Sequence, residues 1–451
     1  MYRNVPNAKI GNSHERPKRV NGRRAPLGRL TWSLLNVPKR LSSRYDQGRH
    51  HNPAVGIERI MLSEFSWDRC YRVSDVDNVL TPALVMYPDV IASNIEQTLK
   101  LLGGDADRWR VHIKTAKLGF TLRMLVERGI PNFKCATTLE LLVACQSGAR
   151  DVLLAYPVMG ANARRAREIA QQFPNVRISV LAENDEQVQQ WRDSPVGVFL
   201  DINPGMNRTG IEQSRSDKIF ALARAIADPG LEFRGLHYYD GQYGGLPEGE
   251  RTKAAHRGYD RLLEIVSELA RSGISVPEVI TSGTPTFPCS LSYEGFRRGK
   301  VVHRVSPGTV VYCDASSLEQ LPKEYGYRPA ALVLTRVVSS PHPGIITCDA
   351  GHKAVSADAG IPTCVAVGHP ELTPLSPSEE HLPLAVKEGA VGPQVGEALY
   401  LIPRHVCPTV NNFDCALLVR DGEVESVESV SARGREAPLL ATADRTLSVR
   451  N

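Results

Sequence analysis

Long apolar runs are missing from this chain of 451 residues. No window approaches the roughly 20 consecutive apolar residues that a membrane-spanning helix requires, so we expect no membrane span. Paired cysteine spacings are missing as well, because the nine cysteines are odd in number and scattered along the chain: Cys70, Cys135, Cys145, Cys289, Cys313, Cys348, Cys364, Cys407 and Cys415. This pattern argues against a disulfide framework and predicts reduced thiols in a cytoplasmic protein.

Acidic residues are scarce in one part of the chain only. Residues 1–60 contain thirteen Lys or Arg against three acidic residues, which leaves 41 basic and 46 acidic residues for the rest. The same segment has hardly any periodic apolar pattern, so we expect a basic, disordered extension. Electrostatic binding of nucleic acid, a transit peptide or a dispensable extension all remain open for it.

Apolar, β-prone runs recur from about residue 75 to residue 315. They lie at Ala83–Tyr87, Arg110–Lys114, Phe133–Ala136, Asp151–Ala155, Arg177–Ala182, Val196–Ile202, Phe233–Tyr239, Glu278–Ser282 and Thr309–Tyr312. Helical patterns separate most of them, as at Ala161–Gln172, Asp217–Ala227 and Lys253–Ser272. This alternation predicts an α/β protein with a (β/α)₈ barrel of the TIM type, and a doubly wound open sheet is the alternative.

The alternation with helices stops after Asp314. Four further strand-like runs are separated by Pro and Gly turns, at Ala330–Ser339, Gly344–Asp349, Val365–Gly368 and Ala398–Pro403. We therefore expect a smaller β-rich domain over residues 316–451, following a barrel over residues 75–315.

One short run in the predicted barrel, Arg110–Lys117, carries Lys114 at the end of a strand. Active sites of barrels assemble at the carboxyl ends of the strands, and a lysine amine buried there can act as a nucleophile and form a Schiff base. The alternative is a solvated lysine with no chemical role. Lys114 alone does not decide between the two.

Three other predicted strand ends carry polar groups. Arg208, in a Gly- and Pro-rich turn, offers a rigid donor fork to an anion or a ring oxygen. His237 and Tyr239 offer acid–base groups and phosphate donors, although His237 could equally be a core histidine. The turn Ser282-Gly283-Thr284 has the hydroxyls and backbone N–H groups of a phosphate-binding nest, or of an ordinary turn.

His405 and Cys407 are two residues apart near the end of the chain. On an extended strand they would share one face, so that both could bind one cation. Imidazole with thiolate suits Zn²⁺ better than Mg²⁺.

Several of these motifs together resemble one family. Val111-His-Ile-Lys-Thr-Ala-Lys117 is similar to the Pro-His-Val-Lys-Thr-His-Lys signature of the D-threonine aldolase and eukaryotic-type D-serine dehydratase family, whose members are pyridoxal phosphate enzymes with the alanine racemase-like fold. Asp349–Asp358, Ser378-Glu-Glu-His381 and Ile402–Asn411 resemble further segments of that family. Two residues depart from its pattern: Ala116 replaces a histidine and Arg404 replaces an asparagine.

The resemblance implies a role for each candidate residue. It places pyridoxal phosphate on Lys114, with the cofactor contacted by Arg208, His237, Tyr239, Ser282, Gly283 and Thr284. It places a divalent metal on His405 and Cys407, with Zn²⁺ expected and Mn²⁺ or Mg²⁺ as alternatives. It also implies a homodimer, and a barrel that the lysine strand opens, with Ala83–Tyr87 before it and Thr309–Tyr312 closing the ring.

We expect a metal-dependent lyase that acts on D-configured 3-hydroxy amino acids, either as an aldolase or as a dehydratase. Two other functions use the same barrel. One is a metal-free amino-acid racemase that uses Lys114 and Tyr239 from opposite faces, and the other is a non-catalytic carrier of pyridoxal phosphate. The His405 and Cys407 pair counts against the carrier.

Overall fold

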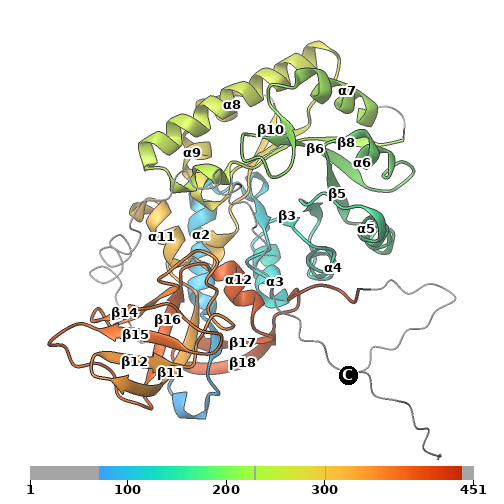
Figure 1. The fold of residues 1–451 in the computed structure, drawn as a ribbon. Coiled ribbons are helices and arrows are strands. Elements are labelled where there is room, and N and C mark those ends of the chain that lie inside the picture. The colour runs from blue at the N-terminus through green and yellow to red at the C-terminus, as the bar shows by residue number, and fades with distance from the viewer. Residues whose placement is uncertain (1–70, 228–229, 300, 439–451) are drawn as a thin grey trace, which may run out of the picture. The chain divides into compact units, whose positions relative to one another are not determined.

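Two β-sheets organise the described part of the chain, which in this computed structural model comprises residues 71–227, 230–299 and 301–438 (Figure 1). The first sheet contains eight parallel strands in the order β10-β9-β8-β6-β5-β4-β3-β2. Their bounds are β2 (Arg110–His112), β3 (Asn132–Cys135), β4 (Asp151–Leu154), β5 (Arg177–Ala182), β6 (Gly197–Asn203), β8 (Glu232–Tyr238), β9 (Glu278–Thr281) and β10 (Val302–Val305). The two-residue strand β7 (Ile211–Glu212) pairs with β6. Trp109 and Val305 form a parallel bridge that brings the two ends of the sheet together, so the sheet is a nearly closed barrel.

Helices alternate with these strands, as the sequence predicts. The helices of the described residues are α2 (Pro88–Leu101), α3 (Gly119–Glu127), α4 (Thr138–Gln146), α5 (Gly160–Gln172), α6 (Asp185–Gln189), α7 (Ser216–Ala227), α8 (Glu248–Arg271), α9 (Phe287–Ser292), α10 (Glu294–Arg298), α11 (Ala315–Gln320) and α12 (Val406–Asn411). Short 3₁₀ turns lie at η2 (Val76–Asn78), η3 (Ala106–Arg108), η4 (Gly241–Gly245), η5 (Thr284–Thr286), η6 (Thr309–Val311) and η7 (Lys323–Tyr325). The expected barrel with its helices is therefore confirmed.

The second sheet is rich in antiparallel pairs and has the order β14-β15-β12-β11-β1-β17-β18. Its strands are β1 (Ala83–Met86), β11 (Ala331–His342), β12 (Ile345–Cys348), β14 (Leu372–Pro374), β15 (Leu382–Val386), β17 (Cys415–Arg420) and β18 (Glu423–Ser429). Strand β16 (Ala398–Pro403) pairs with β11 and with β13 (Cys364–Ala366). A separate β-rich sheet after the barrel was expected and is confirmed.

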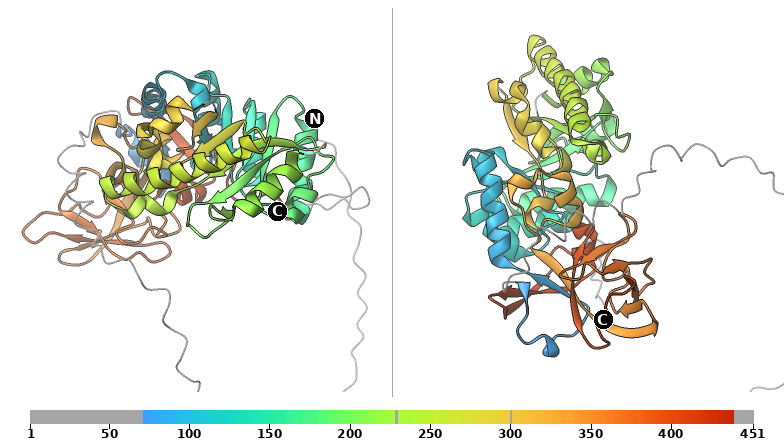
Figure 2. Two further views of the ribbon diagram at one scale, coloured as in Figure 1. Left: turned by 90° about the horizontal axis from the view of Figure 1, so that it is seen from above. Right: turned by 90° about the vertical axis from the view of Figure 1, so that its left-hand side faces the viewer.

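One predicted barrel strand, Thr309–Tyr312, is wrong, and the strand expected before the barrel, Ala83–Tyr87, joins the second sheet. Ala83–Tyr87 forms β1, which lies in the second sheet between β11 and β17 and contributes nothing to the barrel; Figure 2 shows this blue strand among red and orange ones. Thr309–Tyr312 begins with the turn η6, and β10 closes the barrel in its place. Both runs are apolar and buried, and an apolar run does not reveal which sheet it joins.

Ion pairs fill one end of the barrel. Arg110 at the start of β2 lies 2.8 Å from Asp151 and 2.8 Å from Glu278, and Arg234 lies 2.6 Å from Asp151. Burial alone would raise the pKa of Asp151, but Arg110 and Arg234 hold it below its usual value. Buried charges persist only when they are paired in this way.

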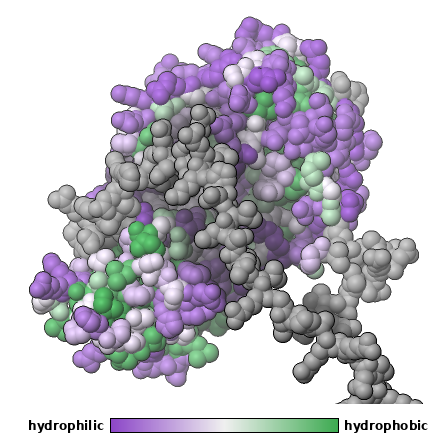
Figure 3. All heavy atoms as spheres, viewed as in Figure 1, coloured by the Kyte–Doolittle hydropathy of each residue, from purple (hydrophilic) through white to green (hydrophobic). Residues whose placement is uncertain are grey.

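The described residues contain no helix that is long and apolar enough to cross a membrane. On the face shown in Figure 3, hydrophilic side chains dominate over the barrel helices α7 and α8, and hydrophobic ones are more frequent over β12, β14 and β15. The predicted basic extension, residues 1–60, lies outside the described residues.

The ion pairs at the barrel end predict a large stability effect. Replacing Glu278 by Gln leaves Arg110 and Arg304 without their shared carboxylate, which should cost about 3–5 kcal/mol of unfolding free energy. The exposed pair of Glu294 with Arg298 supplies the control, because Glu294→Gln should change stability by less than about 1 kcal/mol. Chemical denaturation of the two variants measures both values, and equal stabilities would contradict the role given to this network.

Candidate active site

A cavity of about 270 Å³ opens at the carboxyl ends of the barrel strands, where sites form in such barrels. Its lining combines residues from the barrel strands with residues from the second half of the chain: His112, Lys114, Tyr239, Gly283, Thr284, Pro285, Ser306, Gly308, Thr309, Asp314, Ser316, Ser317, Gln320, Ala359 and His405. Five residues predicted from the sequence, Lys114, Tyr239, Gly283, Thr284 and His405, therefore share one cavity.

Lys114 follows β2 by two residues, and its backbone N–H donates to Nδ1 of His112 at 3.3 Å. The neighbouring residues of the same run have other partners. Thr115 Oγ1 lies 2.9 Å from Cys407 Sγ, and Lys117 Nζ lies 2.5 Å from a Glu140 carboxylate oxygen. Thr115 and Lys117 thus fix the chain that directly follows Lys114, and β2 fixes the chain before it.

Arg208 and Tyr239 form a second part of the site. The Arg208 guanidinium carbon lies 4.9 Å from the centre of the Tyr239 ring, and Tyr239 lines the cavity. Arg208 itself is exposed and does not line the cavity. The guanidinium lies against the Tyr239 ring, and the contact of Arg208 with an anion stays a prediction.

His237 lies below the cavity in a chain of buried polar groups. Its Nδ1 is 2.7 Å from Asp201 Oδ1, and its Nε2 is 3.4 Å from Nζ of Lys134. The second Asp201 oxygen accepts from Thr209 Oγ1 at 2.7 Å. Sequence reasoning missed Lys134 and Asp201, although each stands at an inward position of a strand that ends at the site.

Burial and neighbouring positive charges lower the pKa of three of these bases. Burial, followed by the charges of Lys134 and Lys114, lowers the pKa of His112 well below its usual value. Burial also lowers the pKa of His237, which Asp201 only partly offsets. Burial and the Lys114 charge lower the pKa of Lys134 to about 7.

The turn Ser282-Gly283-Thr284 follows β9 directly. Ser282 has a positive φ of 65°, and its hydroxyl is buried without a hydrogen-bond partner. Thr286 Oγ1 donates to Asp240, whose pKa burial raises to about 6, and Tyr259 OH donates to the other Asp240 oxygen at 2.6 Å. Hydrogen bonds to Asp240 thus hold the residues that follow the turn, and the Ser282 hydroxyl has no hydrogen-bond partner.

His405 and Cys407 meet in a way that the sequence did not predict. His405 is the N-cap of α12 and Cys407 lies within that helix, so the expected extended strand is wrong. The two side chains nevertheless interact: burial alone would raise the Cys407 pKa, and the bond from His405 lowers it. His405 Nδ1 lies 2.7 Å from Asp358 Oδ2, and Asp314 Oδ2 accepts from Val406 N at 2.9 Å.

These donors suit a metal ion in their chemistry. A carboxylate on one imidazole nitrogen, here Asp358 on His405, is the usual support for a histidine that binds metal through the other nitrogen. No set of three or more His, Cys, Asp or Glu side chains in the described ranges is arranged to hold a metal. His405 and Cys407 could therefore hold an ion with its other positions left to water or substrate.

Pyridoxal phosphate, the cofactor that the resemblance implies, fits the residues present. Lys114 supplies an amine in the cavity, and the unpartnered Ser282 hydroxyl belongs to the turn that is expected to bind the phosphate. Lys114, Lys134, Arg110 and Arg208 bring positive charge near this site, and Asp201 offsets part of it at Lys134, which favours an anionic ligand.

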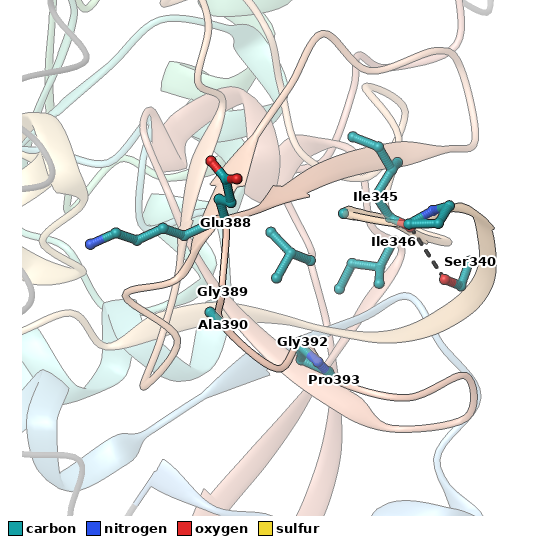
Figure 4. A pocket seen from close by; sticks show the side chains of 12 residues that line it. Ser340, Ile345, Ile346, Glu388, Gly389, Ala390, Gly392 and Pro393 are labelled. Atoms are coloured by element: carbon teal, nitrogen blue, oxygen red, sulfur yellow. Dashed lines mark hydrogen bonds between the residues drawn. The ribbon is translucent and has the colours of Figure 1, made fainter.

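A hollow of about 500 Å³ in the second sheet carries none of the predicted residues (Figure 4). Ile345 and Ile346 line it together with the loop from Glu388 to Pro393, and Ser340 Oγ donates to the Ile345 carbonyl at 3.4 Å. It offers no group of convergent polar side chains of the kind that the barrel cavity holds.

Two family models match the chain. The alanine racemase N-terminal domain covers residues 87–316, and the serine dehydratase domain covers residues 330–419. The first match spans the barrel, and the second spans most of the strands of the second sheet.

Individual relatives match over nearly their whole length. D-threonine aldolase of Arthrobacter sp. is 28% identical over 375 residues, which cover 78% of this chain and 93% of the relative. 3-hydroxy-D-aspartate aldolase of Paracoccus denitrificans is 27% identical over 376 residues, which cover 80% and 94%.

Solved structures show the same fold. D-threonine aldolase from Filomicrobium marinum superposes with a TM-score of 0.73 at 27% identity, over 80% of this chain and 97% of that one. D-threo-3-hydroxyaspartate dehydratase from Delftia sp. HT23 superposes with a TM-score of 0.67 at 20% identity, over 80% and 99%.

In the turn after β9, Gly283 should not tolerate a larger side chain. A Cβ at Gly283 would come within 2.8 Å of the Tyr239 ring, so Gly283→Ala should displace that ring and weaken retention of pyridoxal phosphate about tenfold or more. Gly249 on α8 has open space around it and is the matched control. Equilibrium dialysis of both alanine variants measures retention. Equal retention would show that the cofactor does not occupy this turn.

Proposed function

The chain belongs to the alanine racemase-like family, and on this premise we propose that it is a pyridoxal phosphate-dependent lyase that acts on D-configured 3-hydroxy amino acids. One observation carries the proposal. Lys114 and His405 line the same cavity, because Thr115 and Cys407, 292 residues apart in the chain, meet at 2.9 Å. The relatives named D-threonine aldolase and 3-hydroxy-D-aspartate aldolase support this reaction class.

Residues of the barrel would hold the cofactor. The Lys114 amine would provide the covalent attachment, and Ser282, Gly283 and Thr284 would donate to the phosphate, with Tyr239 lining the same cavity and Arg208 lying against its ring. His237, held by Asp201, contacts Lys134, whose amine lies 5.9 Å from the centre of the Tyr239 ring. Pyridoxal phosphate, when bound, supplies an electron sink for the bond that breaks at the α-carbon.

Residues of the second half of the chain would hold a metal. His405 and Cys407 form a soft donor pair, so we propose Zn²⁺ ahead of Mn²⁺ or Mg²⁺. Asp358 holds the His405 ring in orientation, and Asp314 holds the start of α12 through Val406 N. The metal would supply a Lewis acid for the 3-hydroxyl group of the substrate.

Two reactions fit this arrangement. In the aldolase reaction the Cα–Cβ bond breaks and yields glycine and an aldehyde, and in the dehydratase reaction the 3-hydroxyl leaves and yields a 2-oxo acid and ammonia. A strong Lewis acid on the hydroxyl favours its departure, which favours the dehydratase where the ion is zinc. Both reactions start from the same bound substrate and the same residues.

The proposal extends to the organisation of the protein. We place the cofactor on a barrel domain over about residues 75–315 and the metal ligands on a β-rich domain over about residues 316–451, in a cytoplasmic homodimer. Eight cysteines of the described residues are free thiols, which supports a reducing compartment. Size-exclusion chromatography with light scattering tests the dimer, and a monomeric mass would show that the proposed homodimer is wrong.

The product of the reaction tests the proposal directly. The purified chain with pyridoxal phosphate and Zn²⁺ should release a 2-oxo acid from D-serine, or glycine and an aldehyde from D-threonine. Lys114→Ala should abolish both products because the covalent attachment is lost. Lys100→Ala, on the exposed face of α2, is the control and should retain them. If wild type forms neither product from either substrate, the lyase assignment for these substrates is wrong.

Metal removal tests the second half of the site. A chelator should abolish product formation, and added Zn²⁺ should restore it. Cys407→Ser should lower zinc content measured by atomic absorption to a small fraction of wild type, since the soft donor is gone. Cys415→Ser changes an exposed cysteine and should leave zinc content unchanged. Product formation that persists in the metal-free protein would contradict the metal role, whereas metal-independent racemization without either product would favour the racemase.

A further inference from the structure

A buried arginine of α8 contacts the wall of the cavity. Arg251 is the fourth residue of α8 and is 6% exposed. A positive charge is disfavoured at this place in two ways, because burial removes it from water and the N-terminal end of a helix is itself positive. Burial accordingly lowers the pKa of Arg251. The contacts that the guanidinium makes must offset both costs.

Three backbone carbonyls from different segments surround the Arg251 guanidinium. Nη1 donates to the Pro285 carbonyl at 2.8 Å and to the Gln320 carbonyl at 2.7 Å, and Nε donates to the Leu246 carbonyl at 3.3 Å. Pro285 belongs to η5, Gln320 is the last residue of α11, and both line the cavity. Arg251 therefore joins the turn after β9 to the end of α11.

The segments that Arg251 joins also pack directly against each other. A Cβ at Gly244 of η4 would lie 3.1 Å from Pro285 Cβ and 3.4 Å from Gln320 Nε2. Gln320 Nε2 donates to the Gly244 carbonyl at 3.4 Å. The Gln320 carbonyl ends a helix and so has no partner within it, which makes it a ready acceptor for a buried cation. Arg251 supplies that cation.

The other end of α11 is bonded to the backbone on both sides of His405. The Ser316 N–H donates to the Arg404 carbonyl at 3.3 Å. Asp314, the N-cap of α11, accepts from the Val406 N–H at 2.9 Å. Arg404 and Val406 are the residues directly before and after His405. The short helix α11 thus runs from the turn after β9 at one end to His405 at the other.

We propose that Arg251 is a positioning residue that holds α11, and through it His405, at a fixed distance from the turn after β9. The inference rests on the proposed function, which places the cofactor phosphate at that turn and a metal ion on His405 and Cys407. The contact of Thr115 with Cys407 is one link between the two halves of the site, and Arg251 supplies a second link through α11. A single contact would allow the segment to pivot, and the second contact prevents this.

Loss of the guanidinium should slow the reaction without removing either bound group. Reaction rates depend steeply on geometry, and a misplacement of about 1 Å can cost about a hundredfold. Arg251→Met should therefore lower kcat for product formation from D-serine or D-threonine about a hundredfold. The contents of pyridoxal phosphate and zinc per chain should stay at wild-type values, because Lys114, His405 and Cys407 are unchanged.

Two matched variants accompany this one. Arg271→Met changes an exposed arginine of the same helix and should keep the wild-type rate. Arg251→Lys keeps the charge and can bond one of the two cavity-wall carbonyls, so its rate should lie about tenfold below wild type, the effect of one lost hydrogen bond to a charged group. Arg251→Lys also keeps the test decisive if Arg251→Met fails to fold, which circular dichroism reports.

Hydrogen–deuterium exchange of the full chain gives a readout that needs no substrate. A peptide that covers α11 should exchange about tenfold faster in Arg251→Met than in wild type, because the bond that holds its end is lost. A peptide that covers α5 should exchange at the wild-type rate in both proteins.

The outcomes separate this inference from the proposed function. A wild-type rate in Arg251→Met, or in Arg251→Lys where the first variant does not fold, overturns the role of Arg251. A slower rate with a proportional loss of pyridoxal phosphate or zinc overturns it as well, since that pattern marks a purely structural residue. Unchanged exchange of α11 also overturns it. If wild type forms no product, the lyase assignment fails, and the exchange of α11 alone decides whether Arg251 holds this segment.

Discussion

The contact between Thr115 and Cys407 determines the site, because it joins the strand end that presents Lys114 to the helix α12, which carries Cys407 and begins after His405. Thr115 is held in turn by its neighbours, with Lys114 N bonded to His112 and Lys117 paired to Glu140. The same short run therefore ends a barrel strand, lines the cavity and contacts a distant segment of the chain. A lysine in an isolated barrel would lack the last of these.

Charge is the second constraint on the structure. The far end of the barrel holds Arg110 and Arg234 against Asp151 and Glu278, so charges balance there and the residues are structural. Nearer the cavity, burial and neighbouring positive charges lower the pKa of His112 and Lys134. Burial alone would lower the pKa of His405 too, whereas its hydrogen bond with Cys407 and the charges of Cys407, Asp314 and Asp358 raise it to about 9. Clustered basic groups attract an anionic ligand, and a lowered pKa leaves a larger share of the Lys134 amine neutral. Both properties serve the chemistry proposed for Lys114.

The sequence predicted the fold class well because strand and helix periodicities are local. It could not predict partners that are distant in the chain, and so the pairing of β1 with β11 was not foreseen and β10 was missed as the strand that closes the barrel. Lys114, Tyr239 and His405 were found because each belongs to a recognisable motif. Lys134 and Asp201 were missed because a buried lysine in a strand resembles an edge residue until its neighbours are known. The geometry of His405 and Cys407 was wrong in its secondary structure and right in bringing the two side chains together.

The most direct measurement is peptide mapping of the protein after reduction with borohydride in the presence of pyridoxal phosphate. Reduction makes the bond between the cofactor and its lysine permanent, so mass spectrometry identifies the residue. The account predicts a pyridoxyl group on the peptide that contains Lys114 and none on the peptide that contains Lys134. Label on Lys134, or label spread over exposed lysines, would contradict the assignment on which the proposed chemistry depends.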